Sequence, residues 1–242
     1  MLCCYKYQDL LQLCYKVKRY KGVKVLAVER EKIYSEGIIT RLSQYLKYIV
    51  HLRDTGKRTV TSLEISGHTK INSAEVRRDL IYFGLKGKRG VGFNIDELIS
   101  AFNKILGYND KVNIALIGAG NLGKAILNYK MLDRFGFKIE NVFDNNPEVI
   151  GKVISSRKIK AISELGKIIK EKGINIAILA VPEDSAQNVT DLLVDSGIRV
   201  IINYTSIPIK VPGTVDVETN DPIEKLLHTL YYLSNTVYAG YN

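Results

Sequence analysis

The pattern of apolar residues changes character near residue 110 and divides the chain into two parts. Beyond this point, short apolar runs alternate with amphipathic stretches. The runs lie at 112–117, 139–143, 174–181 and 198–202, and the helical stretches at 163–172 and 185–195. Apolar strands that alternate with helices across short turns are typical of a doubly wound parallel sheet. We therefore predict an α/β domain over residues 111–220.

The part before residue 110 has helical periodicity without such apolar runs. Six residues of the segment 37–52 form one apolar helical stripe: Ile38, Leu42, Tyr45, Leu46, Ile49 and Leu52. A second, weaker helix is expected over Thr61–Thr69, because Ser66 and Gly67 near its middle lower the helix propensity. A further amphipathic helix is expected over residues 96–106, and residues 107–110 are the expected linker.

The segment between these helices, residues 73–84 (SAEVRRDLIYFG), predicts a third helix. Asn72 or Ser73 is suited to cap its first turn, and Gly84 ends it. Three residues recur at the spacing of a buried helix face: Val76, Leu80 and Phe83. The arginines of this helix lie off that face and are therefore expected on the surface.

A basic, glycine-rich segment follows at residues 85–93 (LKGKRGVGF). Glycines at this density favour a tight hairpin with the intervening cations at its tip. Three helices followed by a basic hairpin are the layout of a winged helix-turn-helix, which we predict for residues 37–108. The candidate DNA-binding residues are Ser73, Arg77, Arg78, Tyr82, Lys86, Lys88 and Arg89. The alternative for the two arginines is a solvated helix face, paired with Glu75 or Asp79.

The distribution of charge supports DNA binding by this part of the chain. Residues 1–110 contain 20 Lys and Arg against 11 Asp and Glu, a net charge of +9, out of +10 for the whole chain. The remainder is therefore nearly neutral. A basic N-terminal part next to a neutral C-terminal part predicts that the N-terminal part meets a polyanion such as double-stranded DNA.

A glycine motif stands at the first apolar run of the α/β part. The run 112–117 ends at Gly118, and Gly120 and Gly123 complete a G-x-G-x-x-G spacing before a helix-like continuation, KAILNYKML. Glycines at these positions let the backbone turn sharply and approach a pyrophosphate at a helix N-terminus. Asp144 ends the next strand, 144 − 123 = 21 residues later, where an acid accepts hydrogen bonds from a ribose. This arrangement predicts a Rossmann-like, dinucleotide-binding sheet.

The sequence predicts a structure for the C-terminal segment but no function for the N-terminal segment. Residues 1–36 form an extension whose pattern predicts no function. A later translational start would need a codon other than that of methionine, for instance near Val25 or Val28, because Met131 is the only methionine after Met1; an intact mass that includes residues 1–20 would contradict this hypothesis. Residues 221–242 contain an apolar helix that begins at Pro222. We expect it to pack against another subunit, and packing on its own domain is the alternative.

Cysteine usage and hydropathy exclude several other classes of protein. The cysteines Cys3, Cys4 and Cys14 have no paired spacing, so neither a disulfide framework nor a metal site is predicted. No apolar run approaches the ~20 residues needed to span a bilayer, and the first residues lack the pattern of a signal peptide. We expect a cytoplasmic protein without a membrane partner.

These motifs together resemble the Rex family of bacterial redox-sensing transcriptional repressors over residues 37–242. The resemblance is carried by EVRRDLIYFG, GKRGVGF, GAGNLG, FDNNP and AVPEDSAQ, which occur here in this order. It implies a homodimer whose winged helices read an inverted-repeat operator and whose Rossmann domains bind NAD(H). It also implies that the C-terminal helices are swapped between subunits, and that NADH favours a form that leaves DNA.

The resemblance also implies roles for individual residues. The cofactor-binding residues would be Gly118, Ala119, Gly120, Asn121, Leu122, Gly123, Tyr129, Asp144, Pro182 and Asp221. Tyr129 would lie near the nicotinamide and pair with Asp221 of the partner's terminal helix. Lys47 stands where the family has an arginine in this network; it keeps the charge and loses the bidentate fork. The turn 203–206 and Pro222 also depart from the family pattern, so the coupling between cofactor and DNA is expected to differ in strength.

Two other functions are alternatives to this one. An NAD-dependent oxidoreductase needs an acid or base beside the nicotinamide. However, His51 and His68 lie in the N-terminal part and His228 lies on the terminal helix, so no catalytic residue is predicted. The other alternative is a DNA-binding sensor of a different adenine nucleotide. Asp144 disfavours a ribose 2′-phosphate by charge repulsion but leaves other ribosyl ligands open.

Overall fold

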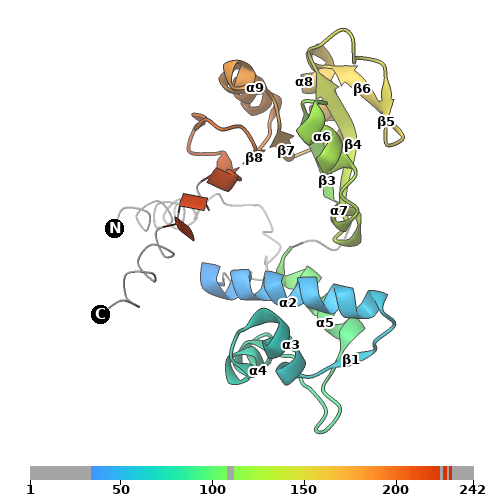
Figure 1. The fold of residues 1–242 in the computed structure, drawn as a ribbon, viewed down its shortest axis with the longest axis vertical. Coiled ribbons are helices and arrows are strands. Elements are labelled where there is room, and N and C mark those ends of the chain that lie inside the picture. Colours follow the sequence, from blue (N-terminus) through green and yellow to red (C-terminus); the bar gives the residue numbers. More distant parts are fainter. Residues whose placement is uncertain (1–33, 108–111, 224–225, 228, 231–242) are drawn as a thin grey trace, which may run out of the picture. The chain divides into compact units, whose positions relative to one another are not determined.

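Helices dominate the first part of the chain, as its periodicity predicts. The computed structural model describes residues 34–107, 112–223, 226–227 and 229–230 (Figure 1). Most of the N-terminal extension, most of the predicted linker and most of the C-terminal segment 221–242 lie outside these residues. In the described residues before 108 the helices are α2 (Glu36–Asp54), α3 (Ser62–Thr69), α4 (Ser73–Tyr82) and α5 (Ile95–Ile105). The four predicted helices of this part are therefore confirmed.

The helix α4 turns the expected face inward. Val76 and Leu80 are fully buried, and Asn72 caps the helix by accepting a hydrogen bond from the Ala74 N–H group at 2.8 Å. Arg77 and Arg78 are exposed. Asp79, proposed above as a surface partner for them, turns inward instead: it is only 6% exposed and accepts a 2.8 Å hydrogen bond from the Tyr45 hydroxyl of α2.

The Tyr45 hydrogen bond should contribute measurably to stability, because it satisfies a buried carboxylate. We expect Tyr45→Phe to lower the free energy of unfolding by about 1–3 kcal/mol, since the ring still packs but the carboxylate loses a donor. Denaturant unfolding measures this loss. Tyr48→Phe is the matched control on the same helix, because the Tyr48 ring stacks on His68 with centroids 4.1 Å apart and needs no hydroxyl to do so. Equal, small effects of both substitutions would contradict the prediction.

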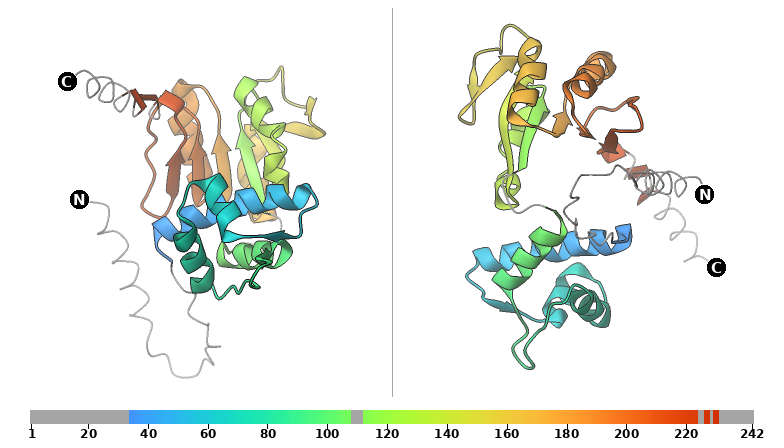
Figure 2. Two further views of the ribbon diagram at one scale, coloured as in Figure 1. Left: turned by 60° about the horizontal axis from the view of Figure 1, so that its bottom comes forward. Right: turned by 180° about the vertical axis from the view of Figure 1, so that it is seen from behind.

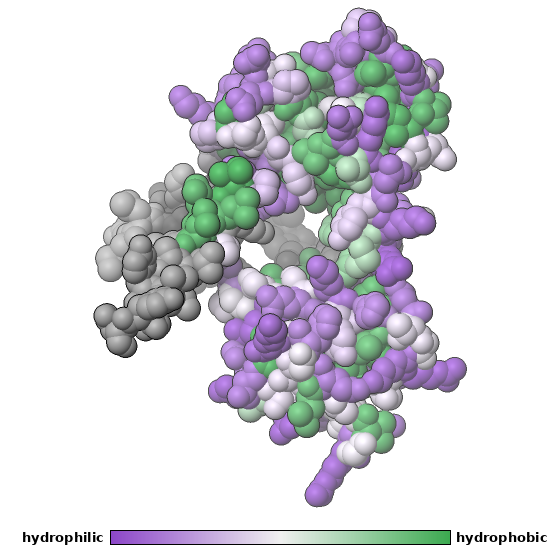
Figure 3. All heavy atoms as spheres, in the orientation of Figure 1, coloured by the Kyte–Doolittle hydropathy of each residue, from purple (hydrophilic) through white to green (hydrophobic). Residues whose placement is uncertain are grey.

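Two short strands tie the helices together. The strand β1 (Thr59–Val60) pairs antiparallel with β2 (Phe93–Asn94). The hairpin predicted at residues 85–93 closes in front of β2, where Lys88 and Gly92 exchange backbone hydrogen bonds of 2.8 and 2.9 Å. In the space-filling view, hydrophilic side chains project from its tip (Figure 3). The hairpin is confirmed, whereas β1 has no counterpart in the sequence prediction.

The second part of the chain is built on a seven-stranded sheet in the order β5-β6-β4-β3-β7-β8-β9. The strands are β3 (Val112–Ile117), β4 (Phe137–Asp144), β5 (Val153–Ile154), β6 (Arg157–Ala161), β7 (Ile176–Leu179), β8 (Val200–Asn203) and β9 (Asp216–Thr219). All neighbours are parallel except β5 and β6. Numbered along the chain, the six parallel strands lie in the order 3-2-1-4-5-6 of a dinucleotide-binding sheet.

Helices cover both faces of this sheet, as a doubly wound fold requires (Figure 2). On one face, α8 (Leu165–Lys172) and α9 (Glu183–Ser196) pack on Ile117, Phe143 and Leu179. On the other face, α6 (Asn121–Leu127) and α7 (Met131–Arg134) pack on Leu116 and Ile178. The predicted parallel sheet is therefore confirmed, although β5, β6 and β9 were not predicted.

Two predicted helices differ in detail. The single helix predicted after the glycine motif is interrupted. The helix α6 ends at Leu127 with Asn128 as its C-cap, and α7 begins at Met131. The Asn128 side-chain amide donates to the Lys124 carbonyl at 3.0 Å and its oxygen accepts from Ser155 at 2.7 Å, so this side chain competes with the helical pattern. The stretch at 163–172 begins as a 3₁₀ turn, Ile162–Glu164, before α8.

The terminal helix begins where the sequence predicts. The described residues from Pro222 to 230 are helical, and the Asp221 carboxylate accepts a 2.9 Å hydrogen bond from the Ile223 N–H group. Four apolar side chains here are more than half exposed: Ile223, Leu226, Leu227 and Leu230. Over the described residues, no helix has both the length and the hydropathy needed to cross a membrane.

Candidate functional site

The three glycines after β3 have three different steric roles. Gly118 has a φ of +98°, and a Cβ atom there would lie 2.2 Å from the Ala180 carbonyl oxygen. A Cβ atom at Gly123 would lie 2.0 Å from the Gly118 carbonyl oxygen. At Gly120, no atom lies within 4 Å of the Cβ position. The first and third glycines therefore let the turn pack, and the second leaves open space beside the backbone, as the approach of a pyrophosphate requires.

The backbone at Gly120 is also suited to an anion. Gly120 is the N-terminal residue flanking α6, and it supplies no side chain to cap the helix. The first N–H groups of a helix have no acceptor within the helix. These groups and the positive end of the helix dipole lie next to the open space at Gly120.

Asp144 closes the other side of this loop. Its Oδ2 atom accepts a 2.7 Å hydrogen bond from the Ala119 N–H group, and its Oδ1 atom accepts a 2.8 Å hydrogen bond from the Asn146 N–H group. The carboxylate is thus fixed at the end of β4. Because an ionised carboxylate has about four acceptor positions, it retains positions for two hydroxyl donors.

A cleft of about 270 Å³ lies at the carboxyl ends of β3, β4 and β7. This edge is the point where the strand order reverses, which is where doubly wound sheets bind their ligands. The cleft brings together four predicted residues: Gly118, Gly120, Asp144 and Pro182. The remaining lining residues were not predicted: Ile117, Asn145, Asn146, Ile162, Ala180, Val181, Ser185 and Val189. Asn145 and Asn146 directly follow Asp144 in the sequence FDNNP, and this position could have predicted that they line the cleft.

The other predicted cofactor residues do not line the cleft. Asn121 and Leu122 are exposed in the first turn of α6, whereas Ala119 of the loop and Gly123 of α6 are buried. Tyr129 is 54% exposed in the turn between α6 and α7, and Asp221 lies at the start of the terminal helix. Their contact with a cofactor remains a prediction.

A second, larger cleft of about 640 Å³ lies between α3, α4 and the basic hairpin. Its charged lining residues are the cations Arg77, Lys86, Lys88 and Arg89, and all four are on the predicted list. The remaining predicted residues, Ser73, Arg78 and Tyr82, lie on α4 without lining the cleft. The lining also includes Ser62 and Leu63 at the start of α3, which were not predicted.

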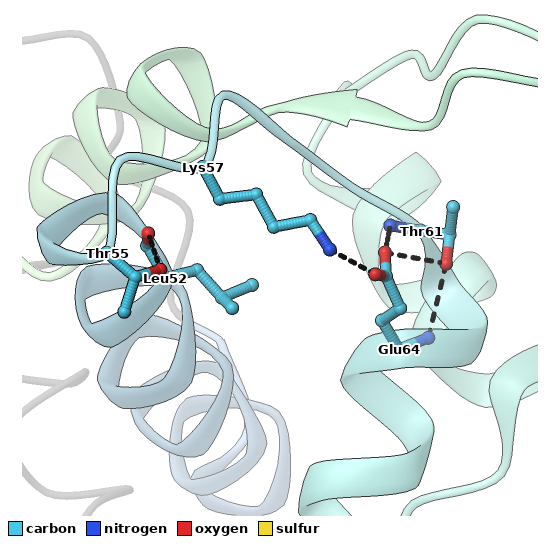
Figure 4. A network of polar contacts seen from close by, with 5 residues as sticks. All are labelled: Leu52, Thr55, Lys57, Thr61 and Glu64. Atoms are coloured by element: carbon cyan, nitrogen blue, oxygen red, sulfur yellow. Dashed lines mark hydrogen bonds and ion pairs between the residues drawn. The ribbon is translucent and has the colours of Figure 1, made fainter.

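The start of α3 is fixed by a polar network that the sequence prediction missed (Figure 4). The Thr61 hydroxyl accepts from the Glu64 N–H group at 3.2 Å, and Glu64 Oε2 accepts from the Thr61 N–H group at 2.8 Å. The Lys57 ammonium group donates to Glu64 Oε1. The spacing T-x-x-E just before a helix is the signature of this capping box and could have revealed it.

This network predicts a dependence on pH. The Lys57 ammonium group, followed by the Thr61 N–H group, holds the pKa of Glu64 below its ordinary value. Stability from this shift is fully present above the ordinary pKa of a glutamate and is lost as the pH falls through the lowered pKa. We expect Glu64→Gln to lower the free energy of unfolding at pH 7 by no more than about 1 kcal/mol, because the side chain is 38% exposed. Denaturant unfolding near pH 7 and in acid measures the difference, which should shrink in acid; a constant difference would contradict the assignment.

Comparison with known proteins gives the same two regions. A family model described as the N-terminus of a putative DNA-binding protein matches residues 34–80, and one described as a CoA binding domain matches residues 109–207. The redox-sensing transcriptional repressor Rex of Rubrobacter xylanophilus is 44% identical over 198 residues, which cover 82% of this chain and 92% of the relative. The chain belongs to the Rex family. The Rex protein of Lactobacillus gasseri is 38% identical over 81% of this chain and 91% of its own.

Solved structures of a Rex-family repressor named RSP share the fold. RSP in complex with β-NAD⁺ and operator DNA matches with a TM-score of 0.74 and 34% identity, covering 86% of this chain and 96% of RSP. RSP in complex with β-NADH matches with a TM-score of 0.71 and 32% identity, covering 87% and 100%. The Rex relatives are transcriptional repressors, so membership of this family decides against the dehydrogenase alternative.

Proposed function

We propose that this protein is a transcriptional repressor that responds to the NADH/NAD⁺ ratio. Residues 37–108 bind a double-stranded, inverted-repeat operator, residues 111–220 bind NAD(H), and residues 221–242 join two subunits. NADH releases the homodimer from DNA in the cytoplasm. The observation that carries the proposal is the open backbone at Gly120, which faces the fixed carboxylate of Asp144 across one cleft in a chain that also has a cationic winged helix.

The nucleotide cleft fits a dinucleotide by its chemistry. The N–H groups at the start of α6 would receive the pyrophosphate, and the free acceptor positions of Asp144 would receive the hydroxyls of the adenosine ribose. The negative charge of Asp144 disfavours a ribose 2′-phosphate, so NAD(H) is preferred over NADP(H). Bound NAD(H) differs by one positive charge on the nicotinamide between its two oxidation states.

Release from DNA follows from linkage between the two binding events. NADH shifts the DNA-bound population only through a different affinity for the two conformations of the dimer. A hundredfold preference corresponds to about 2.7 kcal/mol. We place the sensing network at Tyr129, Asp221 of the terminal helix and Lys47 of α2. Because Lys47 donates from one ammonium group rather than a planar fork, it holds a carboxylate less rigidly than an arginine would.

The apolar side of the terminal helix supports the dimer. Ile223, Leu226, Leu227 and Leu230 are between 56% and 62% exposed. Apolar side chains grouped in this way mark an interaction surface. We assign this surface to the second subunit.

A second candidate ligand is another adenine nucleotide, in particular coenzyme A, because the family model that matches the sheet is described as a CoA binding domain. Coenzyme A has a phosphate on its adenosine ribose, which the Asp144 carboxylate repels. Coenzyme A is therefore included as a ligand in the test.

The test begins with selection of bound sequences from random duplex DNA at near-physiological salt. The retained complex is then titrated separately with NADH, NAD⁺ and coenzyme A. We expect an inverted repeat to be enriched, and NADH to release it at concentrations where the other two do not. Enrichment of no sequence, or release by coenzyme A alone, would overturn the proposed function.

A further inference from the structure

The two adjacent arginines of α4 lie in different surroundings. Arg77 lines the cationic cleft beside the hairpin, and its Nη2 atom donates to the Ser62 hydroxyl oxygen at 3.5 Å. Arg78 is exposed and does not line this cleft. Because consecutive residues of an α-helix are about 100° apart, the two guanidinium groups leave the helix in different directions.

The cleft around Arg77 has the chemistry of an anion site. Its charged lining side chains are all cations, contributed by α4 on one side and by the hairpin residues Lys86, Lys88 and Arg89 on the other. Ser62, a residue that is only 7% exposed, adds a hydroxyl group. A guanidinium beside two ammonium groups suits the paired oxygens of a phosphate.

The walls of this cleft are held in place by backbone packing. A Cβ atom at Gly92 would lie 2.4 Å from the Val60 carbonyl oxygen, so the hairpin lies directly on β1. A Cβ atom at Gly87 would lie 3.0 Å from the Phe93 ring. The paired hydrogen bonds between Lys88 and Gly92 close the hairpin. The backbone that carries the hairpin cations is thus fixed against β1 by the fold.

We propose that Arg77 binds a backbone phosphate of the operator within this cleft, whereas Arg78 contacts base edges and sets sequence preference. The inference rests on the proposed DNA-binding function and assigns different tasks to two residues of that site. Base edges in the major groove are reached by side chains that extend from the exposed face of a recognition helix. Arg78 has that position, and Arg77 is held beside the phosphate-binding cations of the hairpin.

The chain offers a matched pair for the test, because Arg77→Ala and Arg78→Ala remove the same side chain from neighbouring positions. The dissociation constant of each variant is measured by fluorescence anisotropy, on the selected operator and on a scrambled duplex, over a series of salt concentrations. We expect Arg77→Ala to weaken both duplexes by the same factor and to reduce the slope of log affinity against log salt by about 0.9. We expect Arg78→Ala to lower the ratio of operator to scrambled affinity by about 5-fold to 100-fold.

A second measurement makes the assignment independent of the alanine variants' folding. Single phosphates of the operator are replaced by neutral methylphosphonates, one position at a time. One position should weaken the parent protein but leave the affinity of Arg77→Gln unchanged, and no position should behave in this way with Arg78→Gln. The absence of such a position for Arg77 would overturn the inference.

The outcomes separate this inference from the proposed function. A parent protein that shows no preference for any duplex overturns both. A parent that prefers the operator, with variants that lose discrimination and salt dependence to the same extent, overturns the division of tasks alone. Loss of discrimination in Arg77→Ala with a changed salt slope only in Arg78→Ala reverses the assignment and also overturns it.

Discussion

Alanine in place of Gly123 is expected to lower the free energy of unfolding by about 3 kcal/mol or more and to abolish NADH binding. The added methyl group would lie 2.0 Å from the Gly118 carbonyl oxygen, which is well inside van der Waals contact. That oxygen belongs to the backbone and cannot rotate away like a side chain, so α6 must separate from β3. Denaturant unfolding and an NADH titration of the folded fraction measure both effects.

Gly120→Ala is the matched control, because it adds the same methyl group in the same loop. No atom lies within 4 Å of the Cβ position at Gly120, and its φ of −69° suits an alanine. We expect this variant to unfold like the parent but to bind NADH more weakly, since the methyl group occupies the space assigned to the pyrophosphate. A Gly120→Ala variant that binds NADH like the parent would contradict the position of the cofactor, while leaving the packing role of Gly123 intact.

Asp144→Ala is expected to weaken NADH binding by about 10-fold to 1000-fold. The substitution removes the proposed acceptor for two ribose hydroxyls, and hydrogen bonds to a charged group contribute about 1.5–3 kcal/mol each. It also frees the Ala119 and Asn146 N–H groups that hold the loop. Calorimetry gives the affinity, and the concentration of NADH that releases the operator should rise by a similar factor.

An acidic residue away from the cleft controls for the loss of a negative charge. Glu171 of α8 is exposed, and its ion pair with Lys167 is long, at 3.9 Å. Glu171→Ala should bind NADH and operator like the parent. If Asp144→Ala behaves in the same way as Glu171→Ala, the proposed cofactor site is wrong.

The sequence predicts the residues that act through local backbone geometry. The spacing of Gly118, Gly120 and Gly123 follows from the steric needs of one turn, and Asp144 follows from the length of one βαβ unit. The edge strands are different. Residues 157–161 (RKIKA) alternate cations with small or apolar residues, and they form β6 because β4 offers unpaired hydrogen-bonding groups. Their strand conformation comes from the neighbouring strand and not from their own composition.

Contacts between distant residues account for most of what the sequence does not predict. The sequence around Asp79 indicates a charged side chain on the surface of a helix. Its hydrogen-bond partner in the structure, Tyr45, lies 34 residues away in the sequence. Asn146 reaches the nucleotide cleft from the loop after β4, and Ser185 reaches it from the first turn of α9 after β7; only the strand order brings these two segments together. Similarly, the different surroundings of Arg77 and Arg78 depend on the position of the hairpin, which the helical periodicity of α4 does not predict.

The bond between Asp144 and the Ala119 N–H group has a further consequence for affinity. Because this carboxylate already holds the glycine loop at 2.7 Å, the conformational entropy of ordering the loop is lost when the chain folds and not when the ligand arrives. Such a preorganised site leaves little of the binding free energy to be consumed by loop closure. Differences in affinity between two ligands of nearly equal shape then reflect their charge, which is the property that changes between NAD⁺ and NADH.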